Sequence, residues 1–267
     1  MKHHGLVTGT LCLLLLIVAA ATVNAAPVIE EAGWNLVRTI DFESGQAAVY
    51  NPQDGLIYVG SRNSGSDGIY RIAADGTSTK LVSASRVAGL AVDSRNGDIY
   101  FSEDYDGIIF KLAFGATTPE TWVSGFDSGD DDPVGLDIAW GTGNGILVDR
   151  GNGSADEIWK FSADTAQGEV QLNDTVINAA LSDPVDVAVG PSGVFVVDAN
   201  NGIFRLNTDE TLSLINGTLD SPVGIDIDPV TGDLVVLDIT SDALYRVDPI
   251  TGAQSAMFSG FADLGLA

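Results

Sequence analysis

The sequence predicts an all-β fold, a β-propeller of four-stranded blades, of the six-bladed type with its last blade incomplete. Three observations predict this fold. A unit of about 44 residues recurs along the chain, and each copy holds three short apolar runs rich in β-branched residues. Gly, Asn, Asp and Pro separate these runs, as expected for turns between strands. Long stretches of helical periodicity, which helical repeats would need, are missing.

The third strand of each unit has the clearest pattern: an aliphatic, an aromatic, a basic and an apolar residue. It occurs five times, at residues 69–72, 109–112, 158–161, 203–206 and 244–247. Successive basic residues of this pattern are separated by 40, 49, 45 and 41 positions. This period fits a propeller blade.

The innermost strand of each unit lies some twenty residues upstream of that pattern. We place it at residues 47–51, 89–93, 135–138, 186–189 and 224–228. The second strands follow a Gly-containing turn, at residues 56–59, 99–101, 146–148, 194–197 and 234–237. A more variable fourth strand, such as residues 79–82, completes each blade.

The two ends of the chain suggest a partial sixth blade. Gly265-Leu266-Ala267 matches Gly89-Leu90-Ala91, so the chain is expected to end within an innermost strand, roughly 20 residues before that blade would be complete. Residues 34–42 resemble an outer strand without a blade. Joining this outer strand to the C-terminal strand would close the ring and remove exposed strand edges.

Residues 1–25 are predicted to be a secretory signal peptide. Lys2 supplies a basic start, residues 11–21 are apolar, and Val23-Asn24-Ala25 is a small-residue cleavage signature. The apolar run is shorter than the roughly 20 residues of a spanning helix. We therefore expect residues 26–267 to form a single secreted propeller domain that does not insert into a membrane.

Composition excludes several chemistries. Both histidines lie within the first four residues, and the one cysteine, Cys12, lies in the leader. The predicted domain therefore lacks a Ser-His-Asp triad, a Cys nucleophile, a Cys/His zinc site and disulfides. With 37 acidic and 12 basic residues the net charge is −25, which disfavours nucleic acid and anionic lipid as partners.

These repeats resemble the NHL and SMP-30/gluconolactonase-like six-bladed propellers, a TolB-like architecture. Residues 45–58 are similar to the opening blade of the lactonase group, and residues 87–112 and 185–205 are more similar to NHL units. In that group, the resemblance implies a funnel cation held by a Glu, an Asn and an Asp at the starts of inner strands.

The corresponding positions differ in this chain. Gln46 replaces the Glu, and Val134 and Val223 occupy the Pro-x-Gly positions of the Asn and Asp. The rest of this column is Ala88, Val185 and Leu264. A hard cation needs several oxygen ligands, so we expect no cofactor and, at most, millimolar calcium binding in the funnel.

Three further groups of polar residues remain as candidates. Asp137 and Asp226, with Gln46, are expected to line the channel; the carboxylates would form a cation site or an acid and base pair, or bond only to water and backbone. Asp127, Asp130, Asp131 and Asp132 form either a weak calcium loop or a solvated turn. Asn152, Asn173 and Asn216 begin glycosylation sequons that matter only in a eukaryotic source.

The repeated basic residues could form an anion-binding ring, but ion pairing is the favoured interpretation. We expected Arg71, Lys111, Lys160, Arg205 and Arg246 to pair with nearby carboxylates such as Glu103, Asp149, Asp198 and Asp238.

Two function classes remain. The favoured one is a secreted, non-catalytic propeller that binds an extracellular protein or glycan through a loop face. The alternative is an SMP-30/gluconolactonase-like metal-dependent hydrolase or lyase with a divergent site.

Overall fold

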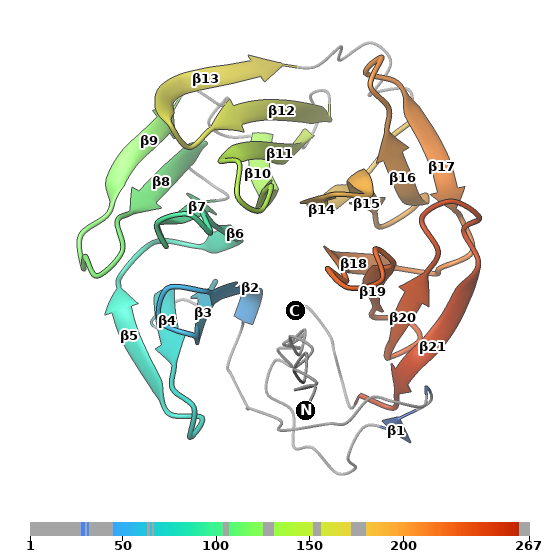
Figure 1. The fold of residues 1–267 in the computed structure, drawn as a ribbon, viewed down its shortest axis with the longest axis horizontal. Helices are drawn as coiled ribbons and strands as arrows, with labels where there is room; N and C mark the ends of the chain where they lie inside the picture. The colour runs from blue at the N-terminus through green and yellow to red at the C-terminus, as the bar shows by residue number, and fades with distance from the viewer. Residues whose placement is uncertain are drawn as a thin grey trace, which may run out of the picture.

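The computed structural model describes residues 28–29, 31, 45–62, 65, 67–103, 107–124, 131–151, 156–171 and 180–261. These residues form antiparallel sheets arranged radially around a central axis (Figure 1). The predicted all-β propeller of four-stranded blades is confirmed. Within the described part of the chain, no helix has the length and apolar character that crossing a membrane requires.

Each blade is built from strands that are consecutive in the chain, with the first strand innermost. The first two blades contain β2 (Gly45–Asn51), β3 (Leu56–Ser61), β4 (Gly68–Ile72) and β5 (Ser78–Val82), then β6 (Val87–Val92), β7 (Ile99–Glu103), β8 (Ile108–Leu112) and β9 (Glu120–Ser124). The third contains β10 (Asp131–Ile138), β11 (Asn144–Gly151), β12 (Glu157–Ser162) and β13 (Thr165–Gln171).

The last two blades follow the same order. The fourth contains β14 (Pro184–Gly190), β15 (Gly193–Asp198), β16 (Gly202–Leu206) and β17 (Leu212–Asn216). The fifth contains β18 (Pro222–Ile227), β19 (Leu234–Asp238), β20 (Ala243–Val247) and β21 (Gln254–Ser259). Adjacent inner strands contact one another in the order β2, β6, β10, β14 and β18.

The blade count differs from the prediction: the described residues form five blades, so six was wrong. The short strand β1 (Val28–Ile29) pairs with β21 and becomes a fifth strand of the last blade. Pairing here satisfies backbone groups at the outer edge of β21, which would otherwise be exposed. Residues 34–42 and 265–267, where we expected strands of a sixth blade, lie outside the described residues.

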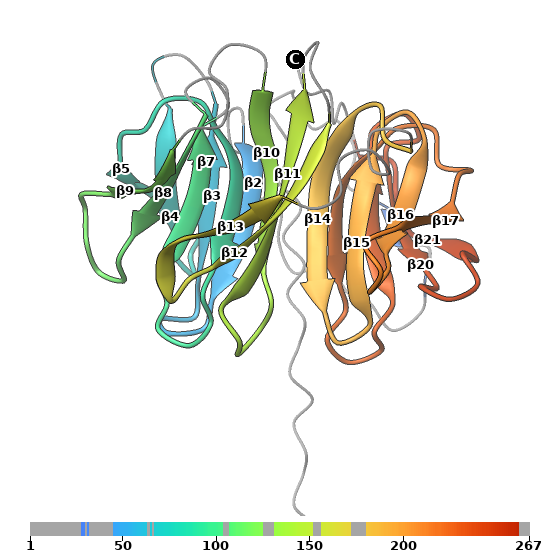
Figure 2. The same ribbon diagram turned by 90° about the horizontal axis from the view of Figure 1, so that it is seen from above.

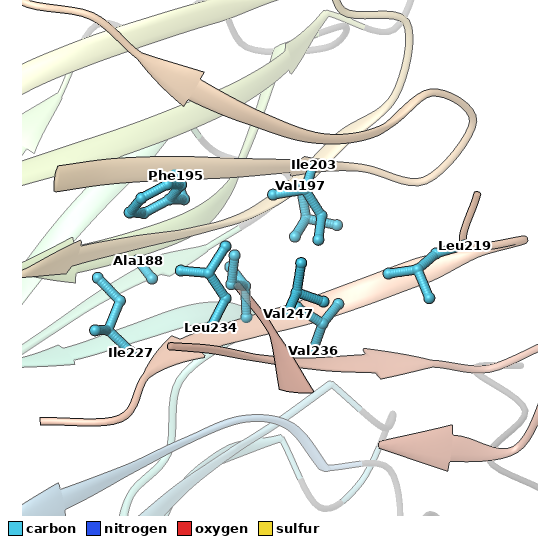
Figure 3. Close-up of a cluster of buried hydrophobic side chains, with 10 residues drawn as sticks. Ala188, Phe195, Val197, Ile203, Leu219, Ile227, Leu234, Val236 and Val247 are labelled. Carbon is cyan, nitrogen blue, oxygen red and sulfur yellow. The ribbon is translucent and has the colours of Figure 1, made fainter. Parts of the chain in front are cut away.

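Hydrophobic clusters fill the spaces between neighbouring blades. Figure 3 shows the cluster between the fourth and fifth blades, where Phe195 and Val197 of β15 face Leu234 and Val236 of β19. All four side chains are buried. Full burial of such a side chain stabilises a fold by about 1.5–3 kcal/mol, so these clusters fix the relative positions of the inner strands.

Candidate functional site

Three carboxylates lie on consecutive inner strands next to the central axis. Asp137 is on β10, Asp186 on β14 and Asp226 on β18. Asp137 and Asp226 share a register, since they lie opposite Ile146 and Val235 of their second strands. Asp186 was missed as a candidate because it occupies the position of a glycine in the neighbouring repeats.

Two of these carboxylates bridge adjacent blades. Oδ2 of Asp137 accepts a hydrogen bond from the Val189 backbone N–H (2.6 Å), and Oδ2 of Asp186 accepts one from the Ile225 N–H (2.9 Å). In each residue Oδ1 accepts the N–H of the next residue in its own strand. The two Oδ2 atoms therefore accept hydrogen bonds from backbone N–H groups at the free edges of β14 and β18. In a continuous sheet, another strand would accept these hydrogen bonds.

The three side chains lie in a shared negative environment. Burial raises the pKa of Asp137 to about 7, opposed by its backbone hydrogen bonds and assisted by the charges of Asp226 and Asp186. Burial also raises the pKa of Asp186 to about 7, with the Asp226 charge adding to the effect. Loss of hydration between the blades also raises the pKa of Asp226, and the Asp228 charge adds to the effect, although Asp226 is more exposed than the other two residues.

The other inner-strand residues named as candidates are neutral. Gln46 lies half-buried on β2, and β6 contributes Ala88 and Ala91. Val134 is buried on β10, and Val185 and Val223 lie on β14 and β18. These residues therefore offer apolar packing and one amide.

The predicted calcium loop is only partly described. Asp127 and Asp130 lie outside the described residues, and Asp131 and Asp132 begin β10. Among the residues that the structure places, no three His, Cys, Asp or Glu side chains are grouped so that they could hold a metal ion.

A second set of carboxylates lies at or near the ends of the second strands. Glu103, Asp149, Asp198 and Asp238 are all buried. Asp198 accepts the N–H groups of Ser182 and Asp183 before β14 and those of Asn200 and Asn201 after β15, over 2.5–3.0 Å. Asp238 caps loops in the same way, and Glu103 accepts the Ser85 N–H (2.8 Å). The repeated acidic residue near this strand end was the signal for this role.

The repeated basic residues consequently have other partners than those predicted. Lys111 pairs with Asp98 at 3.0 Å, Lys160 with Glu210 at 2.8 Å, and Arg246 with Asp233 at 2.7 Å. The Arg205 guanidinium bonds to the Ser192 carbonyl and lies over the Phe195 ring. Pairing with carboxylates was therefore right for Lys111, Lys160 and Arg246, but the named partners were wrong. Glu103, Asp198 and Asp238 accept backbone N–H groups near the other end of the strands.

One of the predicted glycosylation sequons begins at a residue that is buried and hydrogen-bonded. The Nδ2 atom of Asn216 donates to the Gly252 carbonyl (2.9 Å) and to Oε1 of Gln254 (2.7 Å), and the residue is buried. A glycan on this nitrogen would displace both bonds. Asn152 and Asn173 lie outside the described residues.

Large apolar side chains are exposed on one face of the ring. We call it the turn face: the turns between first and second strands and between third and fourth strands, with the residues beside them. Figure 2 shows the first set of turns along the lower edge of the ring. Most large exposed hydrophobic residues belong to it: Tyr50 (45% exposed), Phe114 (46%), Trp140 (66%), Val230 (71%) and Ile250 (82%).

Hydrogen bonds connect the turns of the first three blades. Nε2 of Gln53 donates to the Ser94 carbonyl (3.2 Å), and Oγ of Ser94 accepts from the Gly141 N–H (2.9 Å) beside Trp140. Arg95 joins the second and third blades through Asp164 (2.9 Å). The exposed rings are therefore carried by turns that brace one another, which lowers the entropy lost when a partner covers them.

No protein-family model and no curated protein matches the chain. Among solved structures, a chain of the nidogen/laminin complex is similar, with 16% identity and a TM-score of 0.68, over 81% of this chain and 83% of that one. A putative gluconolactonase has 14% identity and a TM-score of 0.64, over 91% and 82%. A gluconolactonase from Xanthomonas campestris has 14% identity and a TM-score of 0.60, over 81% and 75%.

These likenesses show the propeller fold, shared by enzymes and by chains from binding complexes. They do not distinguish NHL repeats from other propeller families.

Proposed function

We propose that this chain is a secreted, non-catalytic propeller that binds an extracellular macromolecule through its turn face. The observation that carries the proposal is the set of large apolar side chains exposed on the turn face, whose turns brace one another in the first three blades. Trp, Tyr and Phe are enriched at the centres of interfaces, where each contributes a large rigid contact area. Secretion is supported by the leader-like residues 1–25, and kinship with NHL repeats by the units quoted above.

A protein partner fits this face better than a glycan. Val230 and Ile250 are among the most exposed of these side chains, and they belong to the fifth blade, whereas the aromatic residues belong to the first three. Aliphatic side chains offer no flat ring for a sugar to stack on. A partner that covers the exposed residues of the fifth blade and of the first three blades must have a surface wide enough to span the ring.

The experiment is a binding screen with matched variants. The purified chain is applied to arrays of extracellular proteins and of glycans, and each hit is measured by surface plasmon resonance. Trp140→Ser and Ile250→Ser should each weaken a genuine partner at least about tenfold, because interface anchors contribute 1–2 kcal/mol or more. Leu214→Ser is the control, since Leu214 is 57% exposed but lies within the outer strand β17.

Three outcomes would contradict the proposal. Protein hits unaffected by both turn-face changes would exclude this face, and hits confined to glycans would exclude a protein partner. Lactone hydrolysis that is lost on chelation would favour the metal-dependent hydrolase, the activity that the names of two structural neighbours suggest.

A further inference from the structure

The outer edge of the fifth blade carries one strand more than the other blades do. In the part of the chain that the structure describes, the first four blades are four-stranded and end at β5, β9, β13 and β17, whereas β1 is added outside β21 (Figure 1). Val28 pairs with Ser259 and Ile29 with Phe258, in antiparallel register. Because the four-stranded blade is complete without β1, this strand occupies a site on the blade edge.

A bulge in β21 adds a hydrogen-bond acceptor to this site. The register of β20 with β21 shifts between Leu244 and Tyr245 and passes over Met257. The Met257 carbonyl accepts the Glu31 backbone N–H at 3.2 Å. A bulge commonly twists an edge strand away from further pairing, but here its carbonyl holds the added segment for two residues beyond the ladder.

A cation contacts the side chain at the same position of the added segment. Nε of Arg246, on β20, donates to Oε2 of Glu31 at 3.2 Å, and Nη1 of Arg246 donates to Asp233 at 2.7 Å. The side chains of Arg246 and Glu31 are 18% and 30% exposed, so salt screens this pair less than a pair in open solvent. Asp233 orients the guanidinium, and Nε is directed at the carboxylate of the added segment.

We propose that the outer edge of β21 is a binding site for an extended segment of a partner protein, a site that β1 occupies in the same chain. The recognised segment has two extended residues that pair with β21, one spacer and then a carboxylate. Arg246 lies 215 positions from Glu31 in the sequence, so the same contacts are available to a segment of another molecule. Strand addition of this kind takes its affinity from backbone hydrogen bonds and its specificity from side chains.

This site differs from the turn face in place and in chemistry. It lies at the end of β21 farthest from the turn that carries Ile250. It recognises a backbone and a carboxylate, whereas the turn face offers exposed apolar side chains. The two proposals can therefore fail independently.

The test is an NMR titration with a synthetic peptide that copies residues 26–31, at about 0.15 M salt. It is applied to the full chain and to its Ile29→Pro variant, whose own strand lacks a backbone N–H for the ladder. The peptide should shift the amide resonances of Phe258 and Ser259 in the variant. It should bind the variant at least about tenfold more tightly than the unmodified chain, where β1 competes at a millimolar effective concentration. In the unmodified chain, excess peptide should move the Val28 and Ile29 amides to the positions of unstructured residues.

The glutamate of the peptide tests the role of Arg246. A peptide carrying Glu31→Gln should bind at least about threefold more weakly. The net charge of −25 would make an unspecific site prefer this less acidic peptide, so the two explanations predict opposite orders. The two peptides should bind equally to a chain carrying Arg246→Gln. Lys160→Gln is the matched control, since Lys160 has the same place in its repeat and pairs with Glu210.

The peptide comparison decides the matter even if the Arg246→Gln chain does not fold. Amides of Phe258 and Ser259 that do not shift in either chain would overturn the proposal, and so would equal binding of the two peptides to the Ile29→Pro chain. Dimers that form by exchange of β1 while the peptide does not bind would overturn it in favour of a second copy of this chain.

Discussion

The contacts between neighbouring inner strands, which we call seams, differ between the first three blades and the last three. In the first three blades, neighbours approach through glycine. A Cβ built on Gly89 of the inner strand β6 would lie 2.5 Å from the Val134 carbonyl oxygen of β10. A Cβ built on Gly60 of the second strand β3 would lie 2.6 Å from Cγ1 of Val87 on β6. From the third blade onward, carboxylates reach across the seams instead, as Asp137 does to Val189.

The difference shows two solutions to one problem. An inner strand has a free edge whose backbone N–H groups must be packed closely or given an acceptor. Glycine permits close approach of the backbones, and it produces contacts that do not depend on pH. A carboxylate supplies the acceptor, and it makes the seam sensitive to protonation. The seam between β10 and β14 uses both devices, since Gly135 also lies against Asp186.

The largest expected effect comes from removing a loop-capping carboxylate. Asp198→Ala should lower the free energy of unfolding by about 3 kcal/mol, because four backbone donors lose their acceptor. Ser61 occupies the same register in the first blade, and its buried Oγ has no hydrogen-bond partner among the described residues. Ser61→Ala should change stability by less than about 0.5 kcal/mol. Urea unfolding measures the free energy of unfolding of both variants. Equal losses of stability would show that the first and fourth blades do not differ in their dependence on this position.

The next prediction concerns close approach. A Cβ on Gly135 would lie 2.5 Å from Cα of Asp186, whereas a Cβ on Gly224, at the same register in the fifth blade, would meet nothing closer than 3.7 Å. Gly135→Ala should therefore destabilise the chain by about 2 kcal/mol, because the β10–β14 seam must open. Gly224→Ala should cost less than about 0.5 kcal/mol. Thermal unfolding compares them; a larger loss at Gly224 would contradict the seam assignment.

The sequence was sufficient for the strands but not for their assembly. The repeated pattern around Arg71 and its counterparts identified every third strand, because alternating burial within a blade is a local property. The blade number failed because the sixth blade rested on two short segments, residues 34–42 and 265–267, which lie outside the described residues. The strand β1 has only two residues, so no periodic pattern in the sequence could predict that it pairs with β21.

The candidate site was predictable only in part. Asp137 and Asp226 were found because they replace alanines in an aligned column. Asp186 was missed because it stands where the neighbouring repeats have glycine, outside that column. Its role depends on which N–H of the next blade lies opposite it, a tertiary relation shaped by the bulge between Pro184 and Asp186. The exposed residues of the turn face are scattered through the sequence, and their common location depends on the blade topology.

The smallest predicted effect tests whether turns, as well as seams, hold blades together. Arg95 bonds to the buried Asp93 of its own turn (2.7 Å) and to the exposed Asp164 of the third blade (2.9 Å). The Arg95 guanidinium holds the pKa of Asp93 below its usual value. Arg95→Ala should cost about 1 kcal/mol at pH 7, because it leaves a buried carboxylate without its cation.

That loss should shrink as the pH falls below about 4. A depressed pKa contributes stability above the ordinary value, and this contribution disappears once Asp93 is protonated in the folded chain. Lys160→Ala is the control, since Lys160 and Glu210 are 46% and 41% exposed and should contribute less than about 0.5 kcal/mol. Urea unfolding at pH 7 and pH 3.5 separates the cases. Equal losses for the two variants at pH 7 would mean that the Arg95 bridge adds no more than a surface pair, leaving the seams alone to set the blade positions.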